Sequence, residues 1–247
     1  MALIQATQLT KTYGKGETAV TALDHVNLSV DAGEFVAVMG PSGCGKSTLL
    51  HLLGGLDRPT SGQVHIDGHD LSTLTDSALT ELRRRKLGFV FQFFNLIPVL
   101  TSAENAALPL TLDGKPAAQA NAAATQWLKR VGLENKLASR PDQLSGGQQQ
   151  RVAIARALVA EPALILGDEP TGNLDTRASD EIAGLLRQVS DEWGRAVVMV
   201  THDPRIAAYA DRIVFLKDGV IIDDSRLAGQ GAGKSQLVAD HLSALTA

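Results

Sequence analysis

The stretch that decides the fold is Gly40-Pro41-Ser42-Gly43-Cys44-Gly45-Lys46-Ser47, which fits G-x-x-x-x-G-K-[ST] at every fixed position. An apolar run, 34–39, precedes it, and 48–53 is typical of a helix. In this context the glycines let backbone N–H groups turn towards phosphate oxygens, and the helix N-terminus adds positive potential. Lys46 is expected to neutralise the β- and γ-phosphates, and the Ser47 hydroxyl to ligate Mg²⁺. The sequence therefore predicts a nucleotide site on an α/β core.

Further apolar runs indicate the rest of an α/β fold. The runs 163–166 and 196–200 are continuous, which is typical of strands buried on both faces of a parallel sheet. Between them, 180–189 repeats apolar residues at helical spacing. Other short strands are expected at 4–9, 26–30, 34–39, 64–66, 213–216 and 220–222. This order predicts a parallel sheet joined to antiparallel strands near the N-terminus.

The middle of the chain, about 93–160, has a different composition. It is rich in Ala, Gln and Leu and contains almost no β-branched runs. Thr101-Ser102-Ala103-Glu104 has the form of a capping box, in which two side chains satisfy free backbone amides at a helix start. A second helix is expected over 117–131, because Pro116 precedes it and a glycine ends it. We therefore expect a helical subdomain inserted into the α/β core.

Composition narrows the classes of function. The chain has 247 residues, of which 44% are hydrophobic and 20% charged, and this excludes a disordered protein. The 23 Lys and Arg residues against 27 Asp and Glu give a net charge of −4, which argues against a dedicated nucleic-acid-binding protein. The single cysteine, Cys44, excludes an internal disulfide framework and suits a reducing compartment. No apolar run reaches ~18 residues and no secretory pattern is present, so we expect any membrane role to come from another polypeptide.

Two carboxylates, Asp168 and Glu169, follow the apolar run 163–166 after a glycine. At the carboxyl edge of a parallel sheet such acids face the phosphate crevice. Asp168 is therefore expected to hold the magnesium shell, and Glu169 to accept a proton from attacking water. An Asp-Glu pair by itself is more often a solvated strand end, and it is the phosphate loop at 40–47 that favours the functional interpretation.

A third motif, Leu144-Ser145-Gly146-Gly147-Gln148, precedes a long helical stretch, and adjacent glycines at a helix start make the backbone receptive to anions. With the phosphate loop and the acidic pair, this chain resembles the ATP-binding cassette of ABC transporters over about 1–225. The resemblance implies a P-loop NTPase fold with a RecA-like core, an antiparallel β subdomain and the inserted helical subdomain. The remaining residues, 226–247, are predicted to form a flexible tail with one short helix.

The resemblance implies which residues bind ATP and Mg²⁺ within one subunit. Tyr13 would stack on the adenine, Gln92 would sense magnesium and the γ-phosphate, and His202 would contact the γ-phosphate. The implied phosphate-loop residues are Gly40, Pro41, Ser42, Gly43, Cys44, Gly45, Lys46, Ser47 and Thr48. The implied magnesium ligands are Ser47, Gln92 and Asp168. Without the resemblance, Tyr13 is as easily a core residue, and a lone histidine such as His202 is more often an ordinary loop residue.

The resemblance also implies that two copies of the chain act together. Ser145, Gly147 and Gln148 would contact the γ-phosphate of ATP bound to the other subunit, and Asp175 would lie at the dimer seam. ATP would close this homodimer and hydrolysis would release it. A separate integral membrane permease would dock near residues 92–110, which places the chain peripherally on the cytoplasmic side of the inner membrane.

Two longer stretches of the sequence resemble one particular group of ABC ATPases. Residues 88–98 and 168–175 are similar to the group that contains the lipoprotein-release ATPase LolD, the macrolide exporter MacB and the division protein FtsE. One departure is Gly167, where that group leads us to expect alanine or a larger residue. A glycine there is expected to loosen the strand end that carries Asp168 without removing a catalytic group.

The sequence is consistent with three candidate functions. The first is an ATPase subunit that powers an export, lipoprotein-release or macrolide-type transporter. The second is a non-transport regulator of the FtsE type, which pulls on a membrane partner and shares the same ATPase chemistry. The third is a soluble cassette ATPase acting on DNA or ribosomes, which is disfavoured because no heptad run lies between Thr48 and Leu144 and only one cassette is present. The transported molecule is not encoded in these residues.

Overall fold

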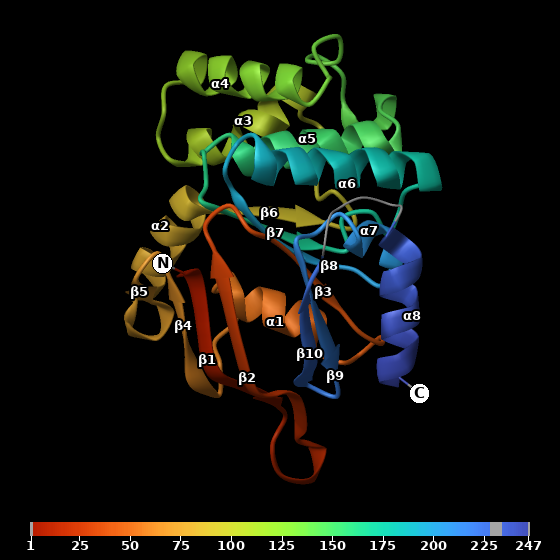
Figure 1. Cartoon of the computed structure of the whole chain (residues 1–247). Helices are drawn as coiled ribbons and strands as arrows, with labels where there is room; N and C mark the ends of the chain where they lie inside the picture. Colours follow the sequence, from red (N-terminus) through yellow and green to blue (C-terminus); the bar gives the residue numbers. More distant parts are fainter. Residues whose placement is uncertain (1, 228–233, 247) are drawn as a thin grey trace.

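The computed structural model describes residues 2–227 and 234–246, which form two β-sheets and a group of helices (Figure 1). The larger sheet has the order β10-β9-β3-β8-β7-β6, and β10 is antiparallel to β9 while the other neighbours are parallel. Its strands are β3 (Phe35–Met39), β6 (Leu87–Phe91), β7 (Leu164–Asp168), β8 (Ala196–Val200), β9 (Arg212–Lys217) and β10 (Val220–Arg226). The smaller sheet is antiparallel, in the order β2-β1-β4-β5. Its strands are β1 (Ala2–Tyr13), β2 (Val20–Asp31), β4 (Ser61–Ile66) and β5 (His69–Asp70).

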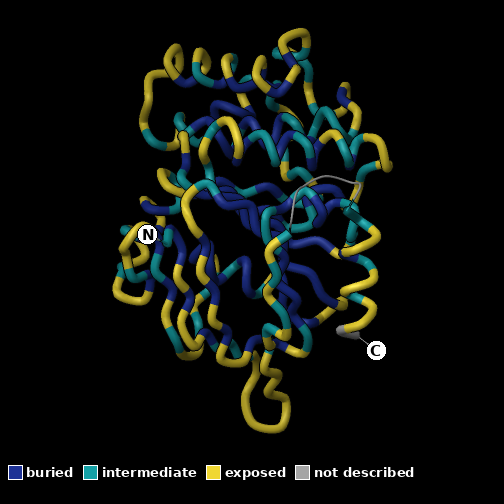
Figure 2. Tube along the Cα trace, viewed as in Figure 1, coloured by how far each residue is buried: buried dark blue, intermediate teal, exposed yellow. Residues whose placement is uncertain are grey.

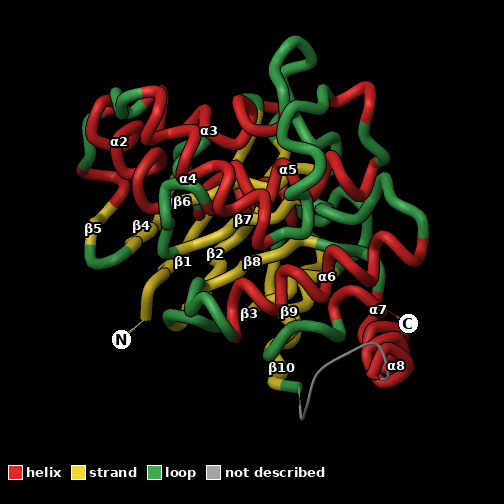
Figure 3. The backbone as a smooth tube through the Cα atoms, turned by 90° about the horizontal axis from the view of Figure 1, so that it is seen from above, coloured by secondary structure: helices red, strands yellow, loops and turns green. Residues whose placement is uncertain are grey.

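Helices lie between the two sheets and over the outer face of the larger sheet. They are α1 (Lys46–Leu53), α2 (Asp76–Lys86), α3 (Ser102–Leu112), α4 (Ala117–Arg130), α5 (Gly146–Leu158), α6 (Thr176–Asp191), α7 (Pro204–Ala207) and α8 (Ser235–Thr246). Short 3-10 helices occur at Gly16–Thr18, Leu71–Thr73 and Pro141–Gln143. Seen from above, α3, α4 and α5 cover the strands on one side, and α8 stands beside α7 at the edge (Figure 3).

The central strand β3 explains how these layers are held together. Phe35 and Met39 face a core cluster that contains side chains of α4, α5 and α6, whereas Val36 and Val38 face a second cluster around α1 and the smaller sheet. All five residues of β3 are buried, so the strand is apolar on both faces, as a parallel strand between two layers must be. The dark blue tube through the sheets in Figure 2 follows this double core.

The predicted fold class is confirmed, and most predicted strands lie where the apolar runs placed them. β8 coincides with the run 196–200, and β3 and β7 begin one residue later than predicted. β6 is absent from the predicted strands, because Gly88 and the polar residues after Phe91 interrupt its apolar run. β6 pairs in parallel with β7 at the end of the larger sheet, and it leads directly into Gln92.

One short helix was predicted within the tail 226–247, and α8 is that helix, while the extent of the flexible tail stays a prediction. Residues 228–233 lie outside the described residues, but α8 packs against α7, and its Val238 is only 2% exposed within the main core. The proposed boundary at 225 falls inside β10, one residue before the strand ends. The helices α3, α4 and α5 lie within 93–160, while the limits of that subdomain stay a prediction. In the described ranges, none of the helices combines the length and the apolar character needed to cross a membrane.

Candidate nucleotide site

The phosphate loop connects the end of β3 to the start of α1, and its shape depends on glycine. Gly40, Gly43 and Gly45 have φ angles of +151°, +80° and +106°, which L-residues rarely adopt. A Cβ on Gly40 would lie 2.0 Å from the carbonyl oxygen of Leu216, and one on Gly45 would lie 2.3 Å from that of Ala22. The surrounding backbone therefore leaves no room for a side chain at these two positions.

Lys46 points back into this loop. Its side-chain nitrogen donates hydrogen bonds of 2.8 Å to the carbonyl oxygens of both Gly40 and Pro41, and the residue is only 9% exposed. With Ser42, Gly43, Ser47, Thr48 and neighbouring groups it lines a cavity of about 300 Å³, which Glu169 also borders. Burial raises the pKa of the Cys44 thiol, and nearby Lys46 opposes that rise only in part, so Cys44 stays a neutral, buried side chain.

The acidic pair stands at the same edge of the sheet, because β3, β8 and β7 are parallel neighbours whose carboxyl ends meet. The Ser47 hydroxyl donates a hydrogen bond of 2.9 Å to the Asp168 carboxylate. Glu169 follows with a left-handed φ of +47°, and its carboxylate lies 3.0 Å from Nδ1 of His202, which comes after β8. The phosphate loop, the acidic pair and His202, which are far apart in the chain, thus meet at one cavity rim.

Gln92 follows β6 and is joined to the loop after Glu169. Its side-chain amide donates to the side-chain oxygen of Asn173 (3.2 Å), and the Asn173 amide donates to the Gln92 backbone oxygen (3.1 Å). The fully buried Gln150 of α5 donates to the backbone oxygens of Phe91 (3.3 Å) and Pro170 (2.6 Å). These bonds hold the segment around Gln92 against the segment that follows the acidic pair.

The third motif forms the start of α5. Ser145 is the N-cap, and it exchanges two hydrogen bonds with Gln148 in a capping box. Gly147 packs closely on Ala178 of α6, whose own start is capped by Asp175. Among the described residues that line the phosphate-loop cavity, none comes from 144–148.

Tyr13 lies at the end of β1 and is 43% exposed, so it is not a core residue. Its hydroxyl donates a 2.9 Å hydrogen bond to Asp57, in the loop after α1. His202 is also open to solvent, with 72% of its side chain exposed. Its contact with Glu169 distinguishes it from an ordinary loop histidine.

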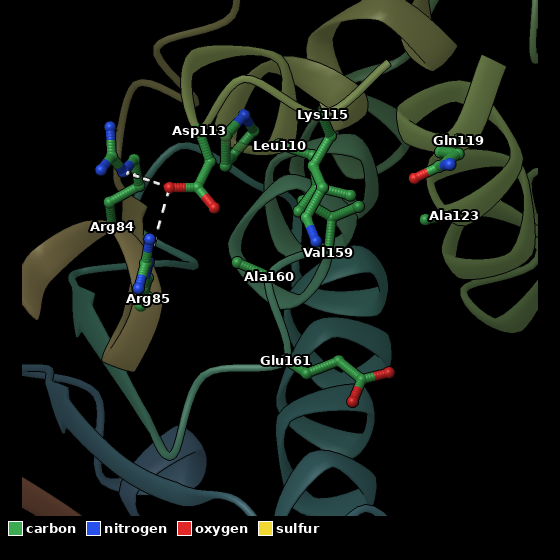
Figure 4. A pocket seen from close by; sticks show the side chains of 11 residues that line it. Arg84, Arg85, Leu110, Asp113, Lys115, Gln119, Ala123, Val159, Ala160 and Glu161 are labelled. Carbon is green, nitrogen blue, oxygen red and sulfur yellow. Dashed lines mark ion pairs between the residues drawn. The ribbon is translucent and has the colours of Figure 1, made fainter. Parts of the chain in front are cut away.

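Two further cavities lie on the side of α2 and α3. A groove of about 660 Å³ has an apolar lining that includes Leu56, Phe89, Phe91, Leu108, Pro109 and Leu112. Beside it, a cavity of about 640 Å³ with a mixed polar and apolar lining opens between α2 and the connection from α3 to α4 (Figure 4). There the Asp113 carboxylate accepts ion pairs from Arg84 (2.8 Å) and Arg85 (3.5 Å), so opposite charges offset each other at its wall.

Comparison with known proteins decides the family. The family model described as ABC transporter matches residues 23–172, which span the phosphate loop, the third motif and the acidic pair. The chain belongs to the ABC transporter family. It is an ATPase of that family, and solved cassettes share its fold across nearly the whole chain.

Individual relatives agree with this assignment. MJ0796, an ABC transporter ATP-binding protein of Methanocaldococcus jannaschii, is 49% identical to this chain. The matched region covers 92% of this chain and 98% of the relative. The lipoprotein-releasing system protein LolD of Geobacter metallireducens is 50% identical over 90% of this chain and 99% of its own. The macrolide export protein MacB of Mannheimia succiniciproducens is 46% identical over 92% of this chain, which corresponds to 35% of that longer protein. A structure of MJ0796, dimeric and bound to ADP and Pi after hydrolysis, has a TM-score of 0.83 at 47% identity, covering 92% of this chain and 99% of that one.

Three residues at the site escaped the sequence reasoning. Gln150 falls on the buried face of α5, and an amide on an otherwise apolar helical face was a usable signal. Asn173 and Asp57 carried no such signal, because each meets its partner from a distant part of the chain.

Proposed function

We propose that this ATPase drives a lipoprotein-release or macrolide-type export system. The relatives named LolD and MacB support the group, at 46–50% identity. The observation that carries the chemistry is the convergence of Lys46, the Ser47–Asp168 pair and the Glu169–His202 pair on one cavity rim. A non-transport signalling ATPase would use the same rim, and the two are separated by reconstituting the chain with its membrane partner and measuring substrate release.

In the proposed reaction, Glu169 is the general base. It would take a proton from a water molecule while the water oxygen bonds to the γ-phosphorus and the bond to the β–γ bridging oxygen breaks, giving ADP and phosphate. His202, 3.0 Å from the Glu169 carboxylate, would orient that carboxylate and contact the γ-phosphate. Lys46 would exchange its two loop carbonyls for phosphate oxygens.

The oxygen groups at the rim fit a magnesium ion. Mg²⁺ prefers hard oxygen ligands, and the Ser47 hydroxyl and the Asp168 carboxylate are already 2.9 Å apart. Gln92 would provide a third ligand from the end of β6. Magnesium would neutralise charge on the β- and γ-phosphates, while these residues keep the cation beside the phosphate loop.

The motif at the start of α5 would serve the other subunit of a homodimer. Ser145, Gly147 and Gln148 would contact the γ-phosphate of the partner's ATP, and Asp175 would lie at the seam. The absence of 144–148 from the lining of this chain's own phosphate cavity supports that arrangement. Helix N-termini stabilise anions, so the α5 start supplies donors that one phosphate loop lacks.

The membrane partner would dock over the apolar groove near residues 92–110. Leu112 and Leu56 line this groove and are 66% and 47% exposed, and Phe93, between the lining residues Phe91 and Asn95, is 72% exposed. Exposed apolar side chains around an apolar groove are typical of a protein interface, and a segment of an integral permease is the occupant we propose. This arrangement would hold the chain peripherally on the cytoplasmic side of the inner membrane.

The assignment of Glu169 is tested with Glu169→Gln, which preserves shape but removes the base. ATP affinity should stay near that of the unmodified chain, while hydrolysis falls by roughly 10²–10⁴-fold. Glu192→Gln, at an exposed position after α6, is the matched control and should hydrolyse ATP normally. Binding is measured by calorimetry and turnover by phosphate release. Near-normal turnover of Glu169→Gln would refute the assignment.

A further inference from the structure

A compact polar cluster lies at the end of β1, outside the cavity of the phosphate loop. The Lys11 ammonium donates to the Asp57 carboxylate and to the Arg58 backbone oxygen, both at 2.7 Å. The other oxygen of the same carboxylate accepts the Tyr13 hydroxyl at 2.9 Å. Burial raises the pKa of Asp57, but hydrogen bonds from Lys11 and Tyr13 outweigh this effect and hold the pKa below its usual range. Asp57 is therefore charged at neutral pH and bridges both side chains.

The cluster joins two parts of the nucleotide site. Asp57 follows the C-terminal end of α1, the helix that begins at Lys46, and its backbone amide donates to the oxygen of His51. Lys11, on β1, pairs with Leu23 of β2, and the adjacent Ala22 lines the phosphate-loop cavity. The cluster therefore lies on the strand paired with the one that carries Ala22, and Asp57 connects Tyr13 to the far end of the phosphate-binding helix.

The two faces of the Tyr13 ring are not equivalent. The Lys11 ammonium lies 4.8 Å from the ring centroid, so a cation covers one face. The Lys11 side chain is only 13% exposed, whereas Tyr13 is 43% exposed, which leaves ring surface open to solvent. A hydrogen bond at the hydroxyl and a cation over one face restrict the ring to one orientation.

We propose that Asp57 is a positioning residue that holds Tyr13 and Lys11, so that the uncovered face of the ring receives the adenine of ATP. This inference rests on the stacking of adenine on Tyr13 that the family resemblance implies, and it adds the group that sets the ring in place. A ring ordered before binding loses less side-chain freedom when the base stacks on it. Removing Asp57 should therefore weaken ATP binding roughly 2- to 10-fold, through the base and not through the phosphates.

The test compares two ligands, ATP and inorganic tripolyphosphate, which has the phosphates but lacks the base. Calorimetry is performed on the full chain and on Asp57→Ala, Asp57→Asn, Tyr13→Ala and the double variant Asp57→Ala/Tyr13→Ala. We expect Asp57→Ala to weaken ATP binding and leave tripolyphosphate binding unchanged. The double variant should bind ATP no more weakly than Tyr13→Ala, because Asp57 acts through the ring. Asp57→Asn should show a smaller loss than Asp57→Ala, and it replaces that variant if the alanine chain does not fold.

Asp76→Asn is the control for a carboxylate nearby, since Asp76 pairs with Arg58 and its side chain is 93% exposed. It should bind both ligands normally. Equal losses of ATP and tripolyphosphate in the Asp57 variants, or additive losses in the double variant, would overturn the proposal in favour of a structural role for Asp57. Unchanged ATP binding in Tyr13→Ala would instead refute the stacking on which it rests. If the unmodified chain binds neither ligand, the proposed nucleotide function itself fails.

Discussion

Gly167 lies at the edge of the larger sheet that carries the acidic pair, and it lacks the methyl group of an alanine. It occupies the position before Asp168 in β7, and its φ is not in the left-handed region. A Cβ there would lie 3.4 Å from the Pro170 side chain and 3.7 Å from that of Met199, which is ordinary contact. The structure therefore has room for the alanine that the family resemblance led us to expect.

We expect Gly167→Ala to raise the free energy of unfolding by about 0.4–1 kcal/mol, because the substitution restricts the unfolded chain without strain in the folded one. Gly45→Ala is the opposing control: its Cβ would meet the Ala22 backbone oxygen at 2.3 Å at a φ of +106°, so unfolding should become easier. Urea denaturation measures both. A loss of stability in Gly167→Ala would show that β7 needs the glycine.

At the scale of elements, α8 is the short helix predicted near the C-terminus, and it packs against the core. Val238 is 2% exposed in the main core, while the adjacent Leu237 is 62% exposed. We expect Val238→Asp to lower the free energy of unfolding by about 1–3 kcal/mol, because it buries a charge without a partner. Leu237→Asp should change it by no more than about 0.5 kcal/mol. Equal effects in chemical denaturation would mean that α8 does not dock through Val238.

Elements with a clear local pattern were predictable, and those that depend on distant partners were not. β3, β7 and β8 are continuous apolar runs, and the phosphate loop and the acidic pair are each defined by adjacent residues. β6 was missed because Gly88 and the polar residues after Phe91 break its short run. The site residues that were not predicted contact partners far away in the sequence. Asp57 lies 44 positions from its partner Tyr13, and Asn173 lies 81 positions from its partner Gln92.

At the scale of the whole molecule, the proposal that the α5 start contacts the partner's ATP predicts an assembly that depends on ATP. Glu169→Gln should be a dimer with ATP and a monomer without it, because ligand that binds across two chains drives their association. Adding Ser145→Arg should abolish this dimer by placing bulk and charge at the seam, while ATP still binds each chain. Light scattering after size exclusion gives the masses.

Ser77→Arg in the same background is the control, since Ser77 is exposed on α2, away from the α5 start. That variant should dimerise normally with ATP. If Ser145→Arg also leaves the dimer intact, Ser145 serves only as the cap of α5, and the shared site is incorrect.

The two hydrogen bonds from Lys46 to its own loop have a consequence for the biogenesis of the protein. A buried ammonium with no acceptor would cost several kcal/mol, on the order estimated for unpaired buried charges. Here Gly40 and Pro41 provide the acceptors at 2.8 Å each, so the folded chain leaves this cation satisfied before any phosphate arrives. A newly synthesised chain can thus bury this cation and complete the loop around it without bound nucleotide.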